Sequence, residues 1–422
     1  MWVRTSPRCR PPPCIRTRPR THSRCLRELP TRNYRLSTSI VPESRKPVRL
    51  CQQVTGHASA MLEPRGIMKS IILSDLLAFS AAFLASSTFT PAARDLAFKV
   101  GLIDQPGPRK VHGTPMPLLG GLAVYLATVF AIAVFVEDDE WSQMLGIFVA
   151  STVALVVGTL DDRGILHHQV KLMLAMPFAA VILIATDMHS EIFYLTAAVP
   201  VLGFPGLWLD FALSFVWFVG IIAAFSILDH MDGLCAGVAA IVAAFSVSFA
   251  AVGGQLLVGT LAAAILGASL GFLRFNARPA RIFLGDGGAM LLGLVAGTLG
   301  IKLRFPELAP TVSWMIPVLI LAVPIFDTTL VTVSRVRRGL VPFSSPGKDH
   351  TAHRLVALGL SHTQAVNVMY GVGILSGLLA WVVALVGSPA AWPVAGMVGV
   401  AGVGAIVWLE RAPYEQQETA ST

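Results

Sequence analysis

Carboxylate groups stand at the ends of several long apolar segments of this 422-residue chain. Asp161 and Asp162 close one segment, and Asp229 and Asp232 close another, where a spacing of three puts both on one helix face. Ionisable groups at membrane depth are costly and usually mark a functional site. Adjacent carboxylates can bind a cation or share a proton, so one of the first pair could act as a base while the other holds a metal. A solvated helix end is the alternative.

The stretch from Asn276 to Gly288 places a further carboxylate, Asp286, between glycines at the start of an apolar run. Backbone N–H groups at such a helix start can approach a phosphate. Asp286 can also supply a hard oxygen to Mg²⁺, which binds through a few carboxylates together with substrate phosphates. Phe283 could stack on a base ring, and a core aromatic is the usual alternative.

Basic residues and histidines form two further clusters. The first runs from 109 to 121, contains Lys110 and His112, and ends in a Gly-Gly helix start. It could hold an anion, or it could only anchor the chain at the membrane. The second, 345–355, contains His350, His353 and Arg354. Histidine with arginine suits a pyrophosphate, a solvated basic loop is the alternative, and a zinc site is weakly supported without cysteine.

Two single charges add to these clusters. Lys171 follows Asp162 by nine residues and lies at the start of the next apolar segment. Asp327 lies inside an apolar segment, near its end. We expect Asp327 to pair with a basic group of the site or with Arg335, and a structural ion pair and a supporting role in the chemistry are equal interpretations.

The composition indicates which elements position these groups. Of all residues, 54% are hydrophobic and only 13% are charged, whereas a soluble domain carries about 25% charged residues. A spanning helix needs about 20 mostly apolar residues. The sequence therefore predicts an all-α, polytopic integral membrane protein with about eleven transmembrane helices, at 70–89, 118–136, 142–160, 171–187, 211–228, 236–253, 256–274, 287–302, 312–333, 366–387 and 391–409.

The loops between these segments alternate in charge. Lys and Arg concentrate in one set of loops, whereas the other set is almost free of them and includes the acidic run 137–140. By the positive-inside rule the basic set is cytoplasmic, with the N-terminus outside and the C-terminus inside. Every polar cluster described above then lies at the cytoplasmic face of a cell inner (plasma) membrane, where we expect the catalytic loops.

The first 66 residues differ from the rest of the chain. Residues 1–69 hold 15 of the 32 Lys and Arg but only three of the 24 acids, and four of the five cysteines. We interpret 1–66 as a mis-called start or a basic disordered leader, with a transit peptide as a third reading, 67–411 as the membrane domain and 412–422 as a cytoplasmic tail. Cysteine spacing indicates neither a zinc site nor a disulfide framework.

Together these clusters offer acids for Mg²⁺, bases for phosphates and an aromatic for a base ring, which suits phosphoryl transfer from a nucleotide-linked donor to a lipid phosphate. In motif order over about 68–370, the chain resembles the polyprenyl-phosphate N-acetylhexosamine-1-phosphate transferase family. The stretch 99–121 is similar to its first cytoplasmic loop, Asp161-Asp162 to its aspartate pair, and 276–286 to its Asn-x-x-Pro-Ala-x-x-Phe-x-Gly-Asp motif. The stretch 353–366 is similar to the branch that uses UDP-N-acetylglucosamine and undecaprenyl phosphate.

The resemblance implies that the chain transfers N-acetylglucosamine-1-phosphate to undecaprenyl phosphate, releases UMP and so initiates the synthesis of a cell-envelope polysaccharide. It implies Mg²⁺, with Mn²⁺ as an alternative. Asp286, with Asp162, would bind the metal, and Asp161 or Asp162 would deprotonate the lipid phosphate. The implied substrate-binding residues are Lys110, His112, Lys171, Asp229, Asp232, Asn276, Phe283, His350, His353 and Arg354. The expected partners are a UDP-sugar, a polyprenyl phosphate and the membrane, with a homodimer left open and no nucleic acid.

The chain also departs from the family motifs. Ser226 stands where the third motif usually has Asn, and His230 stands where it has Gly. Ala352 replaces the middle histidine of a His-x-His-His motif, and Gly347 replaces an acid before it. These changes keep open another UDP-N-acetylhexosamine or a UDP-muramoyl-pentapeptide as donor. A proton-coupled transporter is the remote alternative, and an inactive scaffold is opposed by the retained aspartates.

Overall fold

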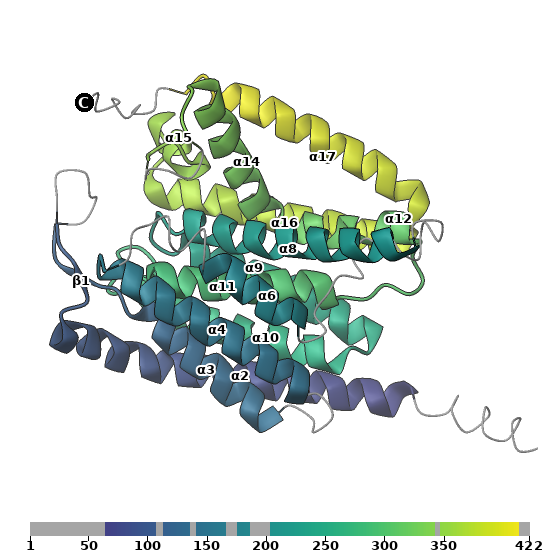
Figure 1. Ribbon diagram of the computed structural model, residues 1–422, viewed down its shortest axis with the longest axis horizontal. Coiled ribbons are helices and arrows are strands. Elements are labelled where there is room, and N and C mark those ends of the chain that lie inside the picture. The colour runs from purple at the N-terminus through teal and green to yellow at the C-terminus, as the bar shows by residue number, and fades with distance from the viewer. Residues whose placement is uncertain are drawn as a thin grey trace, which may run out of the picture. The chain divides into compact units, whose positions relative to one another are not determined.

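A computed structural model describes residues 64–106, 113–135, 141–165, 175–185, 203–341 and 347–412. The long helices run side by side, as Figure 1 shows, and α14 stands at a steep angle to the others. The main helices are α2 (Pro64–Val100), α3 (Gly120–Phe135), α4 (Trp141–Asp162), α6 (Met176–Ala185), α8 (Gly203–Leu228), α9 (Leu234–Gly253), α10 (Leu256–Asn276), α11 (Gly285–Lys302), α14 (Ala322–Arg337), α16 (His362–Val386) and α17 (Ser388–Leu409). Each predicted apolar segment overlaps one of them.

The prediction of an all-α polytopic membrane protein is confirmed, but the number of eleven spans is not. In the described ranges, seven helices are long and apolar enough to cross a membrane, and eight if one bent pair counts as a span. Helices α3 and α6 have only 16 and 10 residues, which is shorter than a spanning helix needs.

The bent pair consists of the short helices α12 (Pro310–Ser313) and α13 (Met315–Ile320) followed by α14, with a bend of 79°. Pro324 has no N–H to donate to the carbonyl of Ile320, so the regular helix is interrupted at this point. The predicted span 312–333 is therefore broken. Its second half, α14, brings Asp327 and Arg335 towards the short helix α15 (Thr351–Ala357).

Helix α11 is surrounded by other helices, and all of its residues are buried except Asp286 and Lys302. Glycines allow this close packing, because a Cβ on Gly158 of α4 would lie 2.3 Å from the Cα of Gly287, and one on Gly121 of α3 would lie 2.4 Å from that of Gly288. Small residues at helix interfaces are typical of membrane proteins. Here they fix the start of α11 between the end of α4 and the start of α3.

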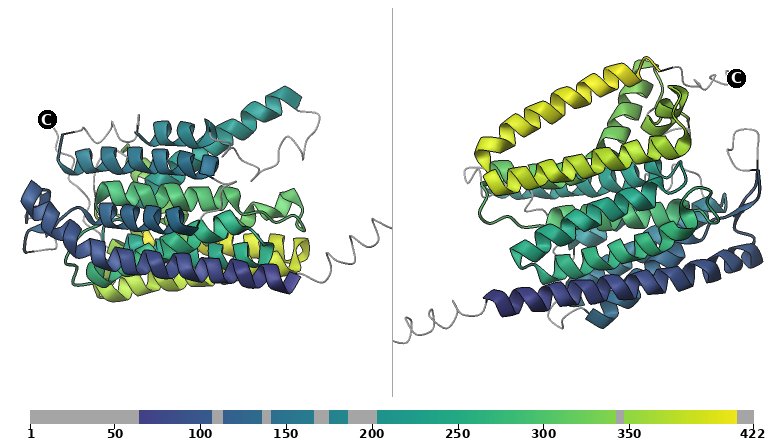
Figure 2. Two further views of the ribbon diagram at one scale, coloured as in Figure 1. Left: turned by 90° about the horizontal axis from the view of Figure 1, so that it is seen from below. Right: turned by 180° about the vertical axis from the view of Figure 1, so that it is seen from behind.

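A two-stranded antiparallel pair, β1 (Ile103–Asp104) and β2 (Met116–Pro117), lies beside this point. The segment before α11 forms backbone hydrogen bonds with β2 and with the start of α3. The Phe283 N–H donates to Pro117 O (2.9 Å), and the Gly120 N–H donates to Phe283 O (3.0 Å). These bonds hold the backbone of Phe283 between β2 and α3. Figure 1 labels β1 at one end of the helix bundle, and the two further views in Figure 2 show the long helices of the bundle lying alongside one another.

Candidate active site

A cavity of about 660 Å³ opens at this end of the bundle. Its lining includes five acidic residues, namely Asp104, Asp162, Asp229, Asp232 and Asp286. It also includes the basic and imidazole side chains of Arg278, Lys348, His230, His353 and His362. The lining residues come from loops and helix ends that are far apart in the sequence, and those loops belong to the set that the charge pattern assigns to the cytoplasm.

The structure brings together many of the residues that the sequence singled out. The predicted residues that line the cavity are Asp162, Asp229, Asp232, Asn276, Phe283, Asp286 and His353. Asp161, His350 and Arg354 are not among its lining residues. Lys110, His112 and Lys171 lie outside the described residues, so their predicted roles stay predictions.

Asp162 and Asp286 meet directly through the main chain. The backbone N–H of Asp286 donates to both carboxylate oxygens of Asp162, at 3.1 and 3.0 Å. Gly285 makes this possible, since its φ is +78° and a Cβ there would lie 2.7 Å from Asp162 Oδ2. The carboxylate of Asp162 thus sits at the N-terminus of α11, where the helix dipole favours negative charge.

Four aspartates, Asp162, Asp229, Asp232 and Asp286, form what we call the acid set. Burial raises the pKa of Asp229 well above its usual range, and the charges of the other three carboxylates raise it further. Such mutual repulsion is relieved by a bound cation. Carboxylate oxygens are the ligands that Mg²⁺ prefers, so the chemistry of the acid set fits this ion.

Asn276 has a positioning role that its side-chain contacts define. Its Oδ1 accepts from the Gly233 N–H (3.0 Å), and its Nδ2 donates to Ile282 O (3.0 Å). The side chain is buried, so both bonds are made away from water. Asn276 thereby joins the loop of Asp229 and Asp232 to the segment that leads into α11.

Two more bonds complete this junction. The Ala280 N–H donates to Asp232 Oδ2 (3.2 Å), and the Tyr370 hydroxyl donates to Gly233 O (2.6 Å). The sequence did not single out Tyr370, because it lies inside the apolar helix α16, and tyrosine is common where such helices meet the membrane surface. Arg278, Lys348 and His362 were also not singled out as site residues, although they stand within or beside the motifs described above.

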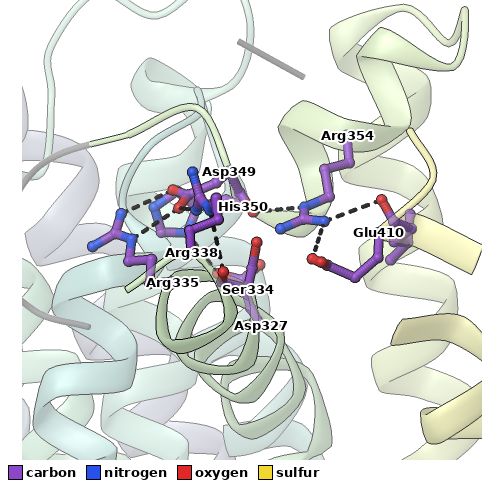
Figure 3. A network of polar contacts seen from close by, with 9 residues as sticks. Asp327, Ser334, Arg335, Arg338, Asp349, His350, Arg354 and Glu410 are labelled. Carbon is purple, nitrogen blue, oxygen red and sulfur yellow. Dashed lines mark hydrogen bonds and ion pairs between the residues drawn. The ribbon is translucent and has the colours of Figure 1, made fainter. Parts of the chain in front are cut away.

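Asp327 is fully buried and pairs with His350, whose Nδ1 lies 3.0 Å from Asp327 Oδ2. The Thr351 N–H donates to the other oxygen, Oδ1 (2.7 Å). Arg335, the alternative partner from the sequence, instead pairs with Asp349 at 2.8 Å, as Figure 3 shows. Burial alone would raise the pKa of Asp349, but hydrogen bonds and charge from Arg335 and Arg338 bring it below its usual range.

Arg354 is directed towards the end of α17. Its side chain is buried, its Nε donates to Asp349 O (2.8 Å), and its Nη1 donates to Leu409 O (3.1 Å) and to Glu410 Oε1 (2.6 Å). Figure 3 shows the guanidinium between α15 and Glu410. These bonds tie α15 to the C-terminal end of α17, and the substrate contact of Arg354 stays a prediction.

Several known proteins are similar to this chain over about two thirds of its length or more. Residues 144–304 match the model of a family described as glycosyl transferase family 4. A Bacillus subtilis (strain 168) protein named probable undecaprenyl-phosphate N-acetylglucosaminyl 1-phosphate transferase is 35% identical over 72% of this chain and 84% of its own. A decaprenyl-phosphate N-acetylglucosaminephosphotransferase from Mycolicibacterium smegmatis is 32% identical over 66% of this chain and 74% of its own. An undecaprenyl-phosphate alpha-N-acetylglucosaminyl 1-phosphate transferase from Escherichia coli O157:H7 is 29% identical over 67% of this chain and 77% of its own.

Proposed function

The chain belongs to glycosyl transferase family 4, and we propose from this premise that it transfers N-acetylglucosamine-1-phosphate from UDP-N-acetylglucosamine to undecaprenyl phosphate, with release of UMP. The names of the B. subtilis and E. coli relatives support the sugar and the lipid acceptor. The observation that carries the proposal is the convergence of the acid set, Arg278 and Lys348 on one cavity. Phosphoryl transfer needs this combination of metal-binding acids and phosphate-binding cations.

Asp286 and Asp162 are the proposed residues that hold Mg²⁺, with Asp229 and Asp232 close enough to add negative charge. When bound, the ion supplies charge neutralisation at the diphosphate and helps to orient it. Ser226, where family motifs usually have Asn, contributes a weak contact, since its Oγ lies 3.4 Å from Asp286 Oδ1. The serine therefore keeps a hydroxyl group beside the Asp286 carboxylate.

The reaction is a displacement at phosphorus. An oxygen of the lipid phosphate attacks the β-phosphorus of the donor, the bond from that phosphorus to the UMP oxygen breaks, and UMP leaves. Asp161 or Asp162 is our candidate for deprotonating the lipid phosphate; Asp162 lines the cavity, and Asp161 is adjacent to it. Arg278 and Lys348 would stabilise the charge that develops on the phosphate oxygens.

The remaining lining residues suit the donor. Phe283 offers a ring for the uracil, and His353 faces the same cavity from α15. We propose that the cavity opens to the cytoplasm at the inner membrane, as the charge of the loops indicates, because that is the compartment of nucleotide sugars. Transfer in this position would begin a lipid-linked glycan for the cell envelope.

A release assay tests the proposal. The purified full-length protein in detergent is supplied with Mg²⁺, undecaprenyl phosphate and labelled UDP-N-acetylglucosamine, and UMP and lipid-linked sugar are quantified. We expect equal amounts of both products, and none without the lipid. Parallel reactions contain UDP-N-acetylgalactosamine or UDP-muramoyl-pentapeptide. Preferred use of either one would replace the proposed donor, and no product from any donor by a folded protein would contradict the proposal.

A further inference from the structure

Three imidazole rings meet at the edge of the cavity, and we call them the histidine cluster. His230 comes from the loop between α8 and α9, His350 precedes α15, and His353 belongs to α15. The ring centroid of His230 lies 4.4 Å from that of His350 and 4.8 Å from that of His353. His230 is the departure from the family motif described above, so this arrangement depends on a residue of this chain and not on the motif.

The hydrogen bonds of His230 define its available nitrogen. Its Nδ1 lies 3.1 Å from the carbonyl oxygen of Ile227, which can only accept, so Nδ1 carries the proton. The Nε2 atom then has a lone pair. It is buried and has no hydrogen-bond partner among the described residues. A buried nitrogen in this state is costly, and it indicates a ligand that the protein atoms do not supply.

Asp327 and His350 provide the complementary atoms. One ring nitrogen from each of His230 and His350 and one carboxylate oxygen of Asp327 all lie within 4.8 Å of one another. Asp327 Oδ2 and His350 Nδ1 are 3.0 Å apart, a spacing that two ligands of one ion can adopt when each bond is about 2.0–2.2 Å long. The Thr351 N–H donates to the other carboxylate oxygen, Oδ1, and so orients the carboxylate, as hydrogen bonds to metal ligands commonly do.

We propose that His230, Asp327 and His350 bind a divalent transition-metal ion that prefers imidazole nitrogen, such as Zn²⁺, at a site separate from the acid set. The ligands are His230 Nε2, Asp327 Oδ2 and His350 Nδ1, and the proton of His350 moves to its Nε2. Two histidines and one carboxylate are a known zinc ligand set that leaves a fourth position for water. Mg²⁺ favours all-oxygen sites and would remain with the acid set.

The three proposed ligands come from separate parts of the fold. His230 lies in the loop between α8 and α9, Asp327 lies in α14, and His350 directly precedes α15. An ion here would join the loop of Asp229 and Asp232 to α14 and α15, and so would stiffen one wall of the cavity.

The test is a binding measurement on the full-length protein in detergent. The protein is stripped with a chelator and dialysed against Zn²⁺ in the presence of excess Mg²⁺, which occupies the acid set. We expect about one Zn²⁺ per chain. Co²⁺ used as a probe should give the visible absorption of a nitrogen-ligated, low-coordinate ion, and Zn²⁺ should raise the thermal unfolding temperature.

Two variants locate the site. His230→Gln and Asp327→Asn should each weaken Zn²⁺ binding on the order of 100-fold and abolish the Co²⁺ absorption. His362→Gln is the matched control, because it removes an imidazole that lines the cavity outside the histidine cluster. Elution as a single species checks that each variant is folded.

Three outcomes would overturn the proposal: no Zn²⁺ retained by the wild type, equal retention by His230→Gln, or equal loss in His362→Gln. The readout does not involve sugar transfer, so failure of this proposal and failure of the proposed function can be told apart.

Discussion

The main-chain N–H of Asp286 donates to both carboxylate oxygens of Asp162, although the two residues are 124 positions apart. This contact joins the end of α4 to the start of α11 and leaves the side chain of Asp286 directed to the cavity. The backbone N–H of Asp286 thus holds the carboxylate of Asp162, while the side chain of Asp286 faces the cavity. The pair forms the rigid centre around which Asp229 and Asp232 are arranged.

Gly285→Ala should disturb this centre. The left-handed φ of +78° costs an L-residue about 1–2 kcal/mol, and the new Cβ would meet Asp162 Oδ2. We expect UMP release to fall on the order of 100-fold, since small displacements of positioned groups can have that effect. Gly254→Ala is the matched control, because its φ is +66° and a Cβ there meets nothing within 4 Å. Equal activity losses in both variants would show that strain alone is responsible.

Phe283→Ala should weaken donor binding without unfolding the chain. The backbone bonds of Phe283 to Pro117 and Gly120 do not need its ring, whereas stacking on a base contributes about 1–3 kcal/mol. We expect the KM for the UDP-sugar to rise roughly tenfold and the KM for the lipid to stay the same. Phe283→Tyr keeps the ring and should behave like the wild type. An unchanged donor KM in the alanine variant would remove Phe283 from the nucleotide site.

Arg354→Ala separates a structural role from the substrate contact that the sequence suggested. Arg354 is buried and bonds to Leu409 O and to the partly exposed Glu410, so its removal should lower the thermal unfolding temperature. The protein that stays folded should keep the wild-type donor KM. The measurements are thermal unfolding and steady-state kinetics at low temperature. A raised KM with unchanged unfolding temperature would instead place Arg354 at the substrate.

Deletion of residues 1–60 tests the proposed domain boundaries. The described residues that line the cavity all lie between 104 and 362. We expect the shortened chain to insert into membranes and to release UMP at the wild-type rate. The measurement is the UMP release assay on membranes from cells that express the full-length chain or the shortened chain. A folded but inactive truncation would contradict our interpretation of the leader.

The sequence was sufficient for the class of fold and for several of the residues that line the cavity. Apolar segments predicted helices close to the observed ones, such as 287–302 for α11, because helix ends coincide with Gly, Asn and Asp. The charge pattern predicted that the loops carrying the acids lie on one side of the membrane, and the structure brings four of these acids to one cavity. That inference needs only the charge pattern of the loops and the length of a spanning helix.

Other features depend on contacts between distant segments and could not be predicted. Arg354 looked like a phosphate ligand, since nothing in a sequence indicates that Glu410, 56 residues away, would bind it. The pairing of Asp327 with His350 and the position of His230 in the histidine cluster depend on how α14 bends and packs. The strands β1 and β2 have two residues each, too few for any alternating pattern.

The central claim is that the acid set binds the metal with the nucleotide donor, and Asp286→Asn tests it most directly. The variant keeps the backbone N–H that Asp162 accepts, so the fold should persist. Mn²⁺ binding, followed by electron paramagnetic resonance with and without UDP-N-acetylglucosamine, is measured beside UMP release. We predict that the donor tightens Mn²⁺ binding in the wild type, and that the variant loses this effect and releases UMP on the order of 1000-fold more slowly. Wild-type Mn²⁺ binding and UMP release in the variant would contradict the account.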